Sequence, residues 1–340
     1  MTEGHTDDRI ILAHGGGGEL TERLLRERIV PKLTNPLLDP LNDSAVLARP
    51  GGRVCMTTDG YVVQPIEFPG GDIGRLAVCG TVNDLAVMGA RPLALSLALI
   101  IEEGLPLSTL DRVMDSIAAS AAEAGVPVAT GDTKVIERRK GDGVMIATAG
   151  IGEMRPDAAM DAARIGPGDA IIINGRIADH GLAVMSAREH LVFETELRTD
   201  VAPLNGLTEA VLDTGADVKF MRDPTRGGLA GVLADLIEAT GLTIEADETA
   251  IPISRTALHT AEMLGLDPLT VANEGKVVMV VSAGDAERVL AACRDHKYGK
   301  HTAVIGRFTD VAPPLAELIT RAGGRRMITR PYGEELPRIC

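Results

Sequence analysis

Aromatic residues are scarce in this chain of 340 residues: tryptophan is absent, and phenylalanine and tyrosine together make up 2% of it. Proteins that bind single-stranded nucleic acid stack the bases on aromatic side chains, and this sequence offers few of them. The formal net charge is −14, which repels a phosphate backbone. The composition therefore argues against nucleic-acid binding.

Long apolar runs are also missing. A membrane-spanning helix needs about 20 consecutive apolar residues, whereas the longest candidate, residues 93 to 101, is too short and contains Ser96. The first residues, MTEGHTDDR, are acidic and polar, unlike a signal peptide. We therefore expect a cytoplasmic protein with no membrane segment.

Cysteine is rare and widely spaced: Cys55, Cys79, Cys293 and Cys340 form no CxxC pair. This spacing favours neither a zinc site nor a disulfide framework. Free cysteine is among the most buried residue types, so the first three are expected to be small apolar residues of the interior.

The remaining composition is that of a globular protein, with 45% hydrophobic and 24% charged residues. The length suggests two domains. Extended and helical patterns alternate, which favours a mixed α/β fold. The alternation of extended and helical patterns is interrupted near residue 155, and a second alternating series begins with a strand over residues 170 to 174. We therefore expect domains at residues 1 to 155 and 156 to 329, and a flexible tail at 330 to 340.

Two helices are well marked in the first half. One is expected over residues 72 to 89 with Asp72 as its N-cap, and one over residues 108 to 125 with Ser108 and Asp111 as a capping box. The second would turn one apolar stripe toward a sheet: Leu110, Val113, Met114 and Ile117. Strands are expected at residues 126 to 130, 144 to 151, 170 to 174, 276 to 282 and 302 to 308, and further helices after Gly227-Gly228 and over 285 to 294.

Four consecutive glycines near the start, Gly15, Gly16, Gly17 and Gly18, can adopt backbone angles closed to other residues and expose amides to a phosphate. No Lys-Ser or Lys-Thr pair follows, so this is not a Walker loop. The alternative is a flexible loop or the start of a helix.

Acidic residues stand beside small or turn-forming neighbours at four places: Asp43, Asp59, Asp84 and Asp132. Asp84, next to Asn83, falls inside an otherwise apolar helix, where an unpaired carboxylate is costly unless a cation compensates it. Such clusters bind Mg²⁺, and the phosphates of ATP share the same ions. The alternative is that each aspartate is a cap or turn residue.

Three further residues are candidates for a role in phosphoryl or proton transfer. Lys134 could neutralise a transferring phosphoryl group or form an exposed salt bridge. Asp223 opens a helix in DPTRGG, where free amides suit an anion, although a simple cap has the same pattern. Glu274, in NEGK before a strand, could act as a base on a loop edge.

The last eleven residues, RPYGEELPRIC, contain prolines and a glycine that resist helix formation. Ten residues beyond Arg330 can span about 33–36 Å when extended, so Cys340 could reach a distant cleft or another protein. The alternative is a disordered end with an incidental thiol.

These stretches together resemble the ATP-binding superfamily of aminoimidazole ribonucleotide synthase, selenophosphate synthetase and thiamine-monophosphate kinase, and within it the HypE family of hydrogenase maturation factors. The markers run nearly end to end: LAHGGGG at 12 to 18, NDSAVL at 42 to 47, TTDGYVV at 57 to 63, GTVNDLAVMGARP at 80 to 92, GDTKV at 131 to 135, DPTRGGL at 223 to 229, NEGK at 273 to 276 and PRIC at 337 to 340. Selenophosphate synthetases carry a reactive cysteine or selenocysteine near the glycine loop, which this sequence lacks.

The resemblance implies a PurM-like fold, in which an α+β N-terminal domain forms a β-barrel with its twin in a homodimer and an α/β domain follows. In the HypE family a HypF-type carbamoyltransferase loads the terminal cysteine. ATP-dependent dehydration then gives a thiocyanate, and the nitrile passes to iron on a HypC-HypD complex as a cyanide ligand for [NiFe] hydrogenase.

By the same resemblance, Cys340 carries the reacting group, Glu274 abstracts a proton and Lys134 stabilises charge. The residues implied to bind ATP are Gly15, Gly16, Gly17, Gly18, Asp43, Asp59, Asn83, Asp84, Asp132 and Asp223, and those implied to bind Mg²⁺ are Asp43, Asp59, Asp84 and Asp132. Two rival functions remain: a small-molecule ATP-dependent synthase or kinase, and a nucleotide-binding scaffold without catalysis.

Overall fold

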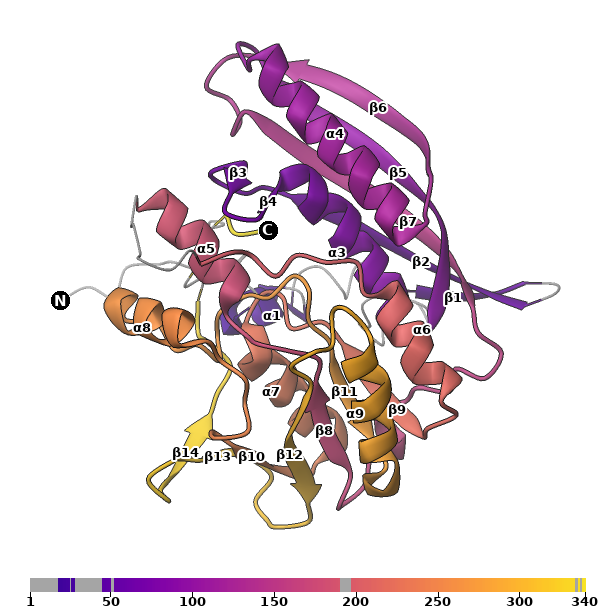
Figure 1. The fold of residues 1–340 in the computed structure, drawn as a ribbon, viewed down its shortest axis with the longest axis vertical. Helices are drawn as coiled ribbons and strands as arrows, with labels where there is room; N and C mark the ends of the chain where they lie inside the picture. The colour runs from indigo at the N-terminus through magenta and orange to yellow at the C-terminus, as the bar shows by residue number, and fades with distance from the viewer. Residues whose placement is uncertain are drawn as a thin grey trace.

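The computed structural model describes residues 18–24, 26–27, 45–49, 52–189, 197–333, 336 and 338–340. In these residues two large β-sheets, both covered by helices, build the molecule (Figure 1). The N-terminal sheet, indigo to magenta, lies above the C-terminal sheet in this view. The mixed α/β fold expected from the alternating pattern is therefore confirmed.

The N-terminal sheet has five strands in the order β1-β2-β7-β5-β6. Its strands are β1 (Ala45–Arg49), β2 (Gly52–Tyr61), β5 (Ala90–Glu102), β6 (Val128–Ile136) and β7 (Val144–Met154). All neighbours are antiparallel except β5 and β6, and these two are joined by a helix, as a parallel connection requires. A separate short hairpin consists of β3 (Glu67–Phe68) and β4 (Gly71–Asp72).

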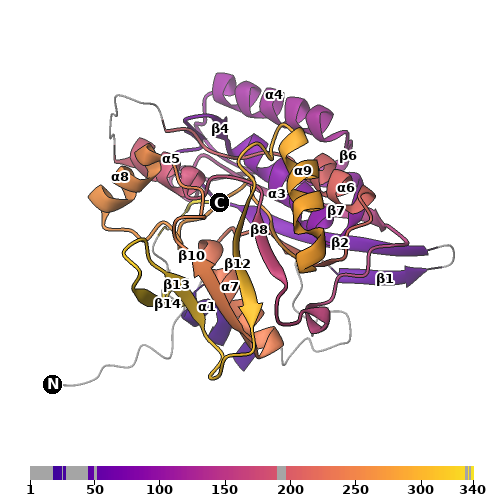
Figure 2. The same cartoon turned by 60° about the horizontal axis from the view of Figure 1, so that its bottom comes forward.

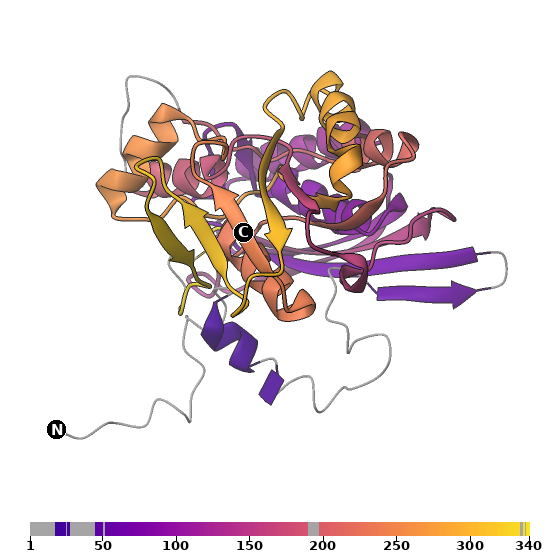
Figure 3. The ribbon, with the colours of Figure 1, turned by 90° about the horizontal axis from the view of Figure 1, so that it is seen from below.

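Helices α3 (Ile73–Val87) and α4 (Leu107–Ala124) cover one face of this sheet (Figures 1 and 3). On the opposite face Met56 and Ile151, direct partners in the β2–β7 ladder, are 46% and 41% exposed. The sheet therefore has one face packed into the core and one face that carries exposed apolar side chains.

The expected N-cap of α3 is confirmed. The Asp72 carboxylate accepts hydrogen bonds from the backbone N–H groups of Gly74, at 2.7 Å, and Arg75, at 3.0 Å. These are two of the donors that the first turn of a helix leaves without an intrahelical partner.

The capping box expected for α4 is wrong. The helix begins at Leu107, one residue earlier than expected, and its N-cap is Pro106, which offers no side-chain acceptor. Ser108 therefore lies inside the first turn, where its side chain cannot act as the cap. In the expected apolar stripe Val113 and Ile117 are buried, but Met114 is exposed.

The C-terminal sheet has seven strands in the order β14-β13-β10-β12-β8-β11-β9. Figure 2 shows the part of this sheet from β14 to β8. Its strands are β8 (Ala170–Ile173), β9 (Val218–Arg222), β10 (Thr243–Asp247), β11 (Val278–Val281), β12 (Ala303–Thr309), β13 (Ala316–Ile319) and β14 (Arg325–Ile328). The strands expected near 170, 276 and 302 correspond to β8, β11 and β12. The fully buried β8 lies between β12 and β11 and pairs antiparallel with both.

Helices pack on both faces of this sheet. Helix α7 (Gly228–Thr240) buries Leu229 and Leu233 against one face, while α6 (Asn205–Asp213) and α9 (Ala286–Asp295) pack on the other. Val87, near the end of α3, belongs to the same core as α6 and α9. Helix α3 is therefore shared between the two halves of the molecule.

Two more helices, α5 (Asp179–Arg188) and α8 (Arg255–Leu264), pack against each other beside the first domain.

The cysteines behave as expected, since Cys55, Cys79 and Cys293 are buried and free. In the part of the chain that the structure describes, no helix combines the length and the apolar character needed to cross a membrane.

Candidate functional site

Residues from both domains line a small cavity of about 50 Å³. Its walls come from β2, α3, the loops before α7 and β11, and the last residue of the sequence. The lining residues are Asp59, Gly60, Tyr61, Gly80, Asp84, Asp223, Thr225, Arg226, Glu274 and Cys340. Five residues selected from the sequence for chemistry, Asp59, Asp84, Asp223, Glu274 and Cys340, therefore meet at one place, although the cavity is too small for a whole nucleotide.

Hydroxyl groups orient the two aspartates of the N-terminal domain. Asp59 Oδ2 accepts hydrogen bonds from the Tyr61 hydroxyl, at 3.1 Å, and from Thr81 Oγ1, at 3.3 Å. Asp84 Oδ2 accepts one from Thr57 Oγ1 at 2.7 Å. The carboxylate of Asp84, which the helix pattern left without a partner, is thus held from the neighbouring strand β2.

Tyr61 is a neutral hydrogen-bond donor in this site. Burial raises the pKa of its phenol well above the usual value, and the charges of Asp59 and Asp84 raise it further. The hydroxyl therefore keeps its proton near neutral pH and can donate it to Asp59.

Glu274 is 3% exposed, and within the described residues its Oε1 atom has no hydrogen-bond partner. Burial raises the pKa of its carboxyl group well above the usual value, and the charges of Asp223 and Asp200 add to this effect. The neutral form of this carboxyl group is therefore favoured over the carboxylate.

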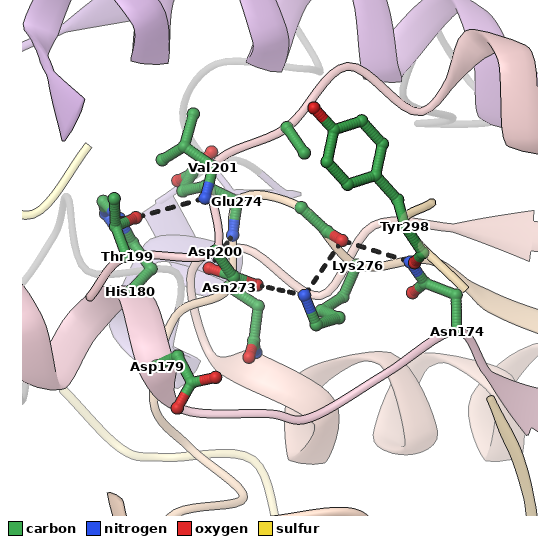
Figure 4. Close-up of polar contacts among 12 residues, drawn as sticks. Asn174, Asp179, His180, Thr199, Asp200, Val201, Asn273, Glu274, Lys276 and Tyr298 are labelled. Carbon is green, nitrogen blue, oxygen red and sulfur yellow. Dashed lines mark hydrogen bonds and ion pairs between the residues drawn. The ribbon is translucent and has the colours of Figure 1, made fainter. Parts of the chain in front are cut away.

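The backbone of Glu274 is held by its neighbours (Figure 4). Its N–H donates to Asp200 Oδ1 at 3.2 Å, and Lys276 Nζ lies 2.8 Å from Asp200 Oδ2. Its carbonyl accepts from Asn83 Nδ2 at 3.2 Å.

The Asn83 amide is fully engaged by backbone groups of the second domain. Besides Glu274, its Nδ2 donates to the carbonyl of Ala202, and its Oδ1 accepts from the N–H of Leu204 at 2.8 Å. This geometry joins α3 to the second domain and orients Glu274. Direct contact between Asn83 and a nucleotide stays a prediction.

The thiol of Cys340 is protonated where it lies. Burial raises its pKa to about 12; Arg226 lowers it, while Glu274 and Asp59 raise it further. A thiol is a good nucleophile only as the thiolate. The sulfur in this cavity is therefore a poor nucleophile.

The last residues pack against the protein, whereas the sequence predicts an extended or mobile tail. Arg338 and Cys340 lie antiparallel to the stretch after β2, because their carbonyls accept from the N–H groups of Gln64 and Val62, each at 3.2 Å. Between them Ile339 is 3% exposed. Burial of this apolar side chain and the paired backbone groups stabilise the docked position.

Of the four glycines expected to bind phosphate, only Gly18 lies within the described residues, as Gly15, Gly16, Gly17 and also Asp43 fall outside them. Gly18 touches the beginning of the terminal segment: a Cβ there would lie 2.3 Å from the carbonyl oxygen of Pro331. The next residue, Glu19, donates its N–H to the same oxygen at 3.0 Å. Close backbone approach therefore requires glycine at position 18.

Asp132 and Lys134 lie away from the cavity. Both are on β6, the edge strand farthest from β1, and their side chains are 62% and 70% exposed. They form a salt bridge of 3.1 Å with each other. Three strand spacings separate β6 from β2, or about 14 Å. Strand β6 runs to residue 136 rather than 130, so Asp132 pairs with Ala98 of β5 instead of following a strand end.

Among the residues that the structure describes, no three His, Cys, Asp or Glu side chains lie close enough to hold a metal ion. Asp59 and Asp84 nevertheless offer carboxylate oxygens, the donors that Mg²⁺ prefers. The unpaired Oε1 of Glu274 adds a buried oxygen on the opposite wall. The donors are thus of the type that a magnesium ion takes, and magnesium binding here stays a prediction.

His180 is a site residue that sequence reasoning missed. It is fully buried near the start of α5, and its Nε2 lies 2.9 Å from the carbonyl oxygen of Ile339. Its only sequence signal is its place in ADHGL at the start of a helix. The contact joins positions 159 residues apart, which no local pattern reveals.

A larger cavity of about 480 Å³ lies near the other end of α3, between β5 and α6. Arg53, Arg91 and Glu153 are among its lining residues, and none of the candidate catalytic, ATP-binding or metal-binding residues is. Its size therefore does not mark the reacting site.

Comparisons with known proteins match both halves of the chain. Residues 41–154 match the N-terminal domain of AIR synthase related protein, and residues 166–313 match its C-terminal domain. Carbamoyl dehydratase HypE of Rhizobium leguminosarum bv. viciae is 50% identical over 336 residues, which cover 98% of this chain and 95% of that protein.

Solved structures of HypE proteins are also similar to this chain. A chain in the crystal structure of a HypE-HypF complex has a TM-score of 0.86 and 44% identity, covering 91% of this chain and 99% of that one. HypE crystallised in complex with ATP has a TM-score of 0.82 and 42% identity, covering 98% of this chain and 100% of that one.

Proposed function

Because this chain belongs to the AIR synthase related family and, within it, to the HypE carbamoyl dehydratases, we propose that it converts an S-carbamoyl group on its own Cys340 to a thiocyanate. The chain is an enzyme of hydrogenase maturation that binds ATP. The observation that carries the proposal is the position of Cys340, which lies in one cavity with Asp59, Asp84, Asp223 and Glu274.

The reaction removes water from a thiocarboxamide: the carbon–oxygen bond breaks, the nitrogen loses two protons and a nitrile remains. ATP supplies the phosphoryl group that makes the oxygen a leaving group. Asp59 and Asp84 would hold a magnesium ion, which would neutralise the charge of the phosphates. Glu274 would exchange a proton with the nitrogen, since a raised pKa brings a carboxyl group toward the operating pH.

The charge of the cavity suits the loaded cysteine better than a thiolate. Burial and then the acidic residues Glu274 and Asp59 disfavour an anion at the sulfur, as the raised pKa of the thiol indicates. An S-carbamoyl group is neutral and has no sulfur-bound proton to lose. The cavity therefore accepts the modified side chain, whereas loading by a HypF-type carbamoyltransferase needs the thiol elsewhere.

A homodimer would explain why Asp132 and Lys134 lie away from the cavity in a single chain. Asp132 and Lys134 are exposed on the edge strand β6, and a second chain would bring its own copies of them to a nucleotide held at Asp59 and Asp84. The exposed pair Met56 and Ile151 offers an apolar surface on the same sheet. We therefore retain the shared β-barrel and the roles of Asp132 and Lys134 as part of the proposal.

The partners follow from the same reaction. A HypF-type carbamoyltransferase would load Cys340, as the HypE-HypF complex of a similar protein suggests, and a HypC-HypD complex in the cytosol would receive the nitrile. A small-molecule ATP-dependent synthase or kinase would not require Cys340. The scaffold rival needs no proton-exchanging group such as Glu274.

Intact mass spectrometry tests the proposal directly. Protein loaded by a HypF-type carbamoyltransferase should lose the mass of one water after addition of ATP and Mg²⁺. Cys340→Ala should never gain the carbamoyl mass, whereas Cys293→Ala, which removes a buried cysteine, should behave as wild type. Carbamoylation of Cys340→Ala, or ATP turnover on a small molecule without Cys340, would refute self-modification.

Glu274→Gln tests the proton-transfer role. The variant should bind ATP and accept the carbamoyl group, but dehydrate it about 10²–10⁴-fold more slowly, the usual contribution of general acid–base catalysis. The rate of water loss in a single turnover is the measurement, and the exposed Glu262→Gln is the control. An unimpaired Glu274→Gln would remove Glu274 from the mechanism.

A further inference from the structure

We propose that His180 is a positioning residue that holds the backbone of Ile339 and thereby places Cys340 in the cavity for dehydration. The inference builds on the proposed function, because it concerns the docking of the residue that carries the reacting group. It starts from one contact: His180 Nε2 lies 2.9 Å from the Ile339 carbonyl oxygen.

The hydrogen-bond partners determine the protonation of the imidazole ring. A carbonyl oxygen can only accept, so Nε2 must carry the proton that is shared with Ile339. The other nitrogen, Nδ1, then accepts from the hydroxyl of Thr199 at 2.8 Å. Burial lowers the pKa of His180, which agrees with a neutral ring of this single tautomer.

The ring is held in place independently of the docked segment. Phe68 packs edge-on against it, with ring centroids 5.5 Å apart and planes at 81°. Thr199 is itself fixed, because its N–H donates to the carbonyl of Pro69 and its Oγ1 accepts from the N–H of Val201. The donor that meets Ile339 is therefore pre-organised.

Holding the carbonyl of Ile339 fixes the residue that follows it. Consecutive Cα atoms are about 3.8 Å apart, so the Cα of Cys340 can only lie on a small arc around the held peptide. The N–H of Val62 then binds the backbone oxygen of Cys340 at 3.2 Å. Together the two contacts direct the sulfur toward Glu274 and Asp59.

Arg188 adds a second side-chain contact, to the backbone of the residue before Ile339. We call the contacts of His180, Arg188, Val62 and Gln64 with the last three residues the backbone clamp. Its guanidinium donates to the carbonyl of Arg338 at 2.8 Å and to that of Gln64 at 2.9 Å. His180 and Arg188 both belong to α5, whereas Val62 and Gln64 follow β2. The docked segment is thus gripped between the two domains through its backbone, and His180 is the member of this clamp that is completely buried.

Alkylation of Cys340 by iodoacetamide tests the docking without using the enzymatic reaction. The docked thiol is partly buried and protonated, so its alkylation rate should follow the undocked fraction. His180→Ala should raise this rate about tenfold, the effect expected when a buried carbonyl loses its donor. The other three cysteines are buried, and intact mass spectrometry counts the modified residues.

Matched variants separate the hydrogen bond from packing. His180→Gln retains an N–H donor of similar reach and should recover most of the wild-type alkylation rate. Thr199→Val removes the hydroxyl that sets the tautomer and should raise the rate by a smaller factor, whereas Thr199→Ser should not. The exposed His259→Ala should leave it unchanged. If His180→Ala does not fold, the Gln and Thr199 variants still measure the effect.

The single-turnover loss of water from carbamoylated protein is the second readout. His180→Ala should slow it about tenfold at saturating ATP, with the KM for ATP unchanged. Folded His180 variants with wild-type alkylation and dehydration would overturn the inference, as would equal effects of His180→Ala and His180→Gln. If wild-type protein loses no water while alkylation still depends on His180, the proposed function fails and the docking stands.

Discussion

Burial shifts the charge state of single carboxyl groups in this protein. Asp179, beside His180 at the start of α5, has its pKa raised to about 7, mainly by burial and next by the charge of Asp200, while Lys276 and Arg176 lower it. A carboxyl group whose pKa is higher in the folded than in the unfolded state favours folding most at low pH. That stabilising contribution is complete below about pH 4 and is lost as the pH rises through about 7.

Replacement of Asp179 with asparagine should therefore stabilise the protein above pH 7. The pKa difference of about three units corresponds to at most about 4 kcal/mol. Because Asp179 is only partly buried, solvent screening reduces this to about 2 kcal/mol, and we expect a Tm increase of roughly 5 °C at pH 8. The increase should disappear near pH 4. Thermal unfolding at both pH values checks this, and the exposed Asp115→Asn is the control. An equal Tm change at both pH values would contradict the assigned cause.

At the scale of single residues, the sequence singled out the acidic groups as candidates, whose roles stay predictions, and it carried no information on their charge state. Glu274 and Asp223 are 51 positions apart in the sequence, yet the charge of Asp223 raises the pKa of Glu274 because the fold places both on one cavity. A pKa depends on burial and on neighbours in space. Neither quantity is visible in a motif such as NEGK.

At the scale of elements, helix positions were easier to predict than helix ends. Both α3 and α4 appear where the apolar pattern and the flanking glycines place them. The N-cap of α3 is Asp72, as expected, but α4 begins after Pro106 without a side-chain cap. Capping depends on which residue first takes helical backbone angles, and a shift of one position changes the cap.

Alanine substitutions at Asp72 and Asp111 compare the confirmed cap of α3 with the expected cap of α4 that is not formed. Asp72→Ala removes an acceptor for two backbone N–H groups and should lower stability by about 1 kcal/mol, or roughly 2–4 °C in Tm for a domain of this size. Asp111→Ala, in the first turns of α4, should change stability by less than about 0.5 kcal/mol. Thermal unfolding of both variants is the measurement. A larger loss in Asp111→Ala than in Asp72→Ala would contradict the cap assignment.

At the scale of the whole molecule, the exposed face of the N-terminal sheet is the surface that a second chain would cover. Ile151→Glu places a charge beside Met56 on this face and should convert a dimer into monomers. Light scattering coupled to size exclusion measures the mass, with Val311→Glu, at an exposed apolar position of the second domain, as the control. A wild-type monomer, or an intact Ile151→Glu dimer, would contradict the shared barrel.

The sequence by itself determined the mixed α/β class, the positions of the main helices and strands, and the residue types able to carry the chemistry, because periodicity, glycines and acidic residues are local features. Only the tertiary structure decided that Cys340 meets Asp59, Asp84, Asp223 and Glu274, that Asp132 and Lys134 stay apart from them, and that His180 binds Ile339. Strand order and domain packing set these distances, and they arise from contacts between residues far apart in the chain.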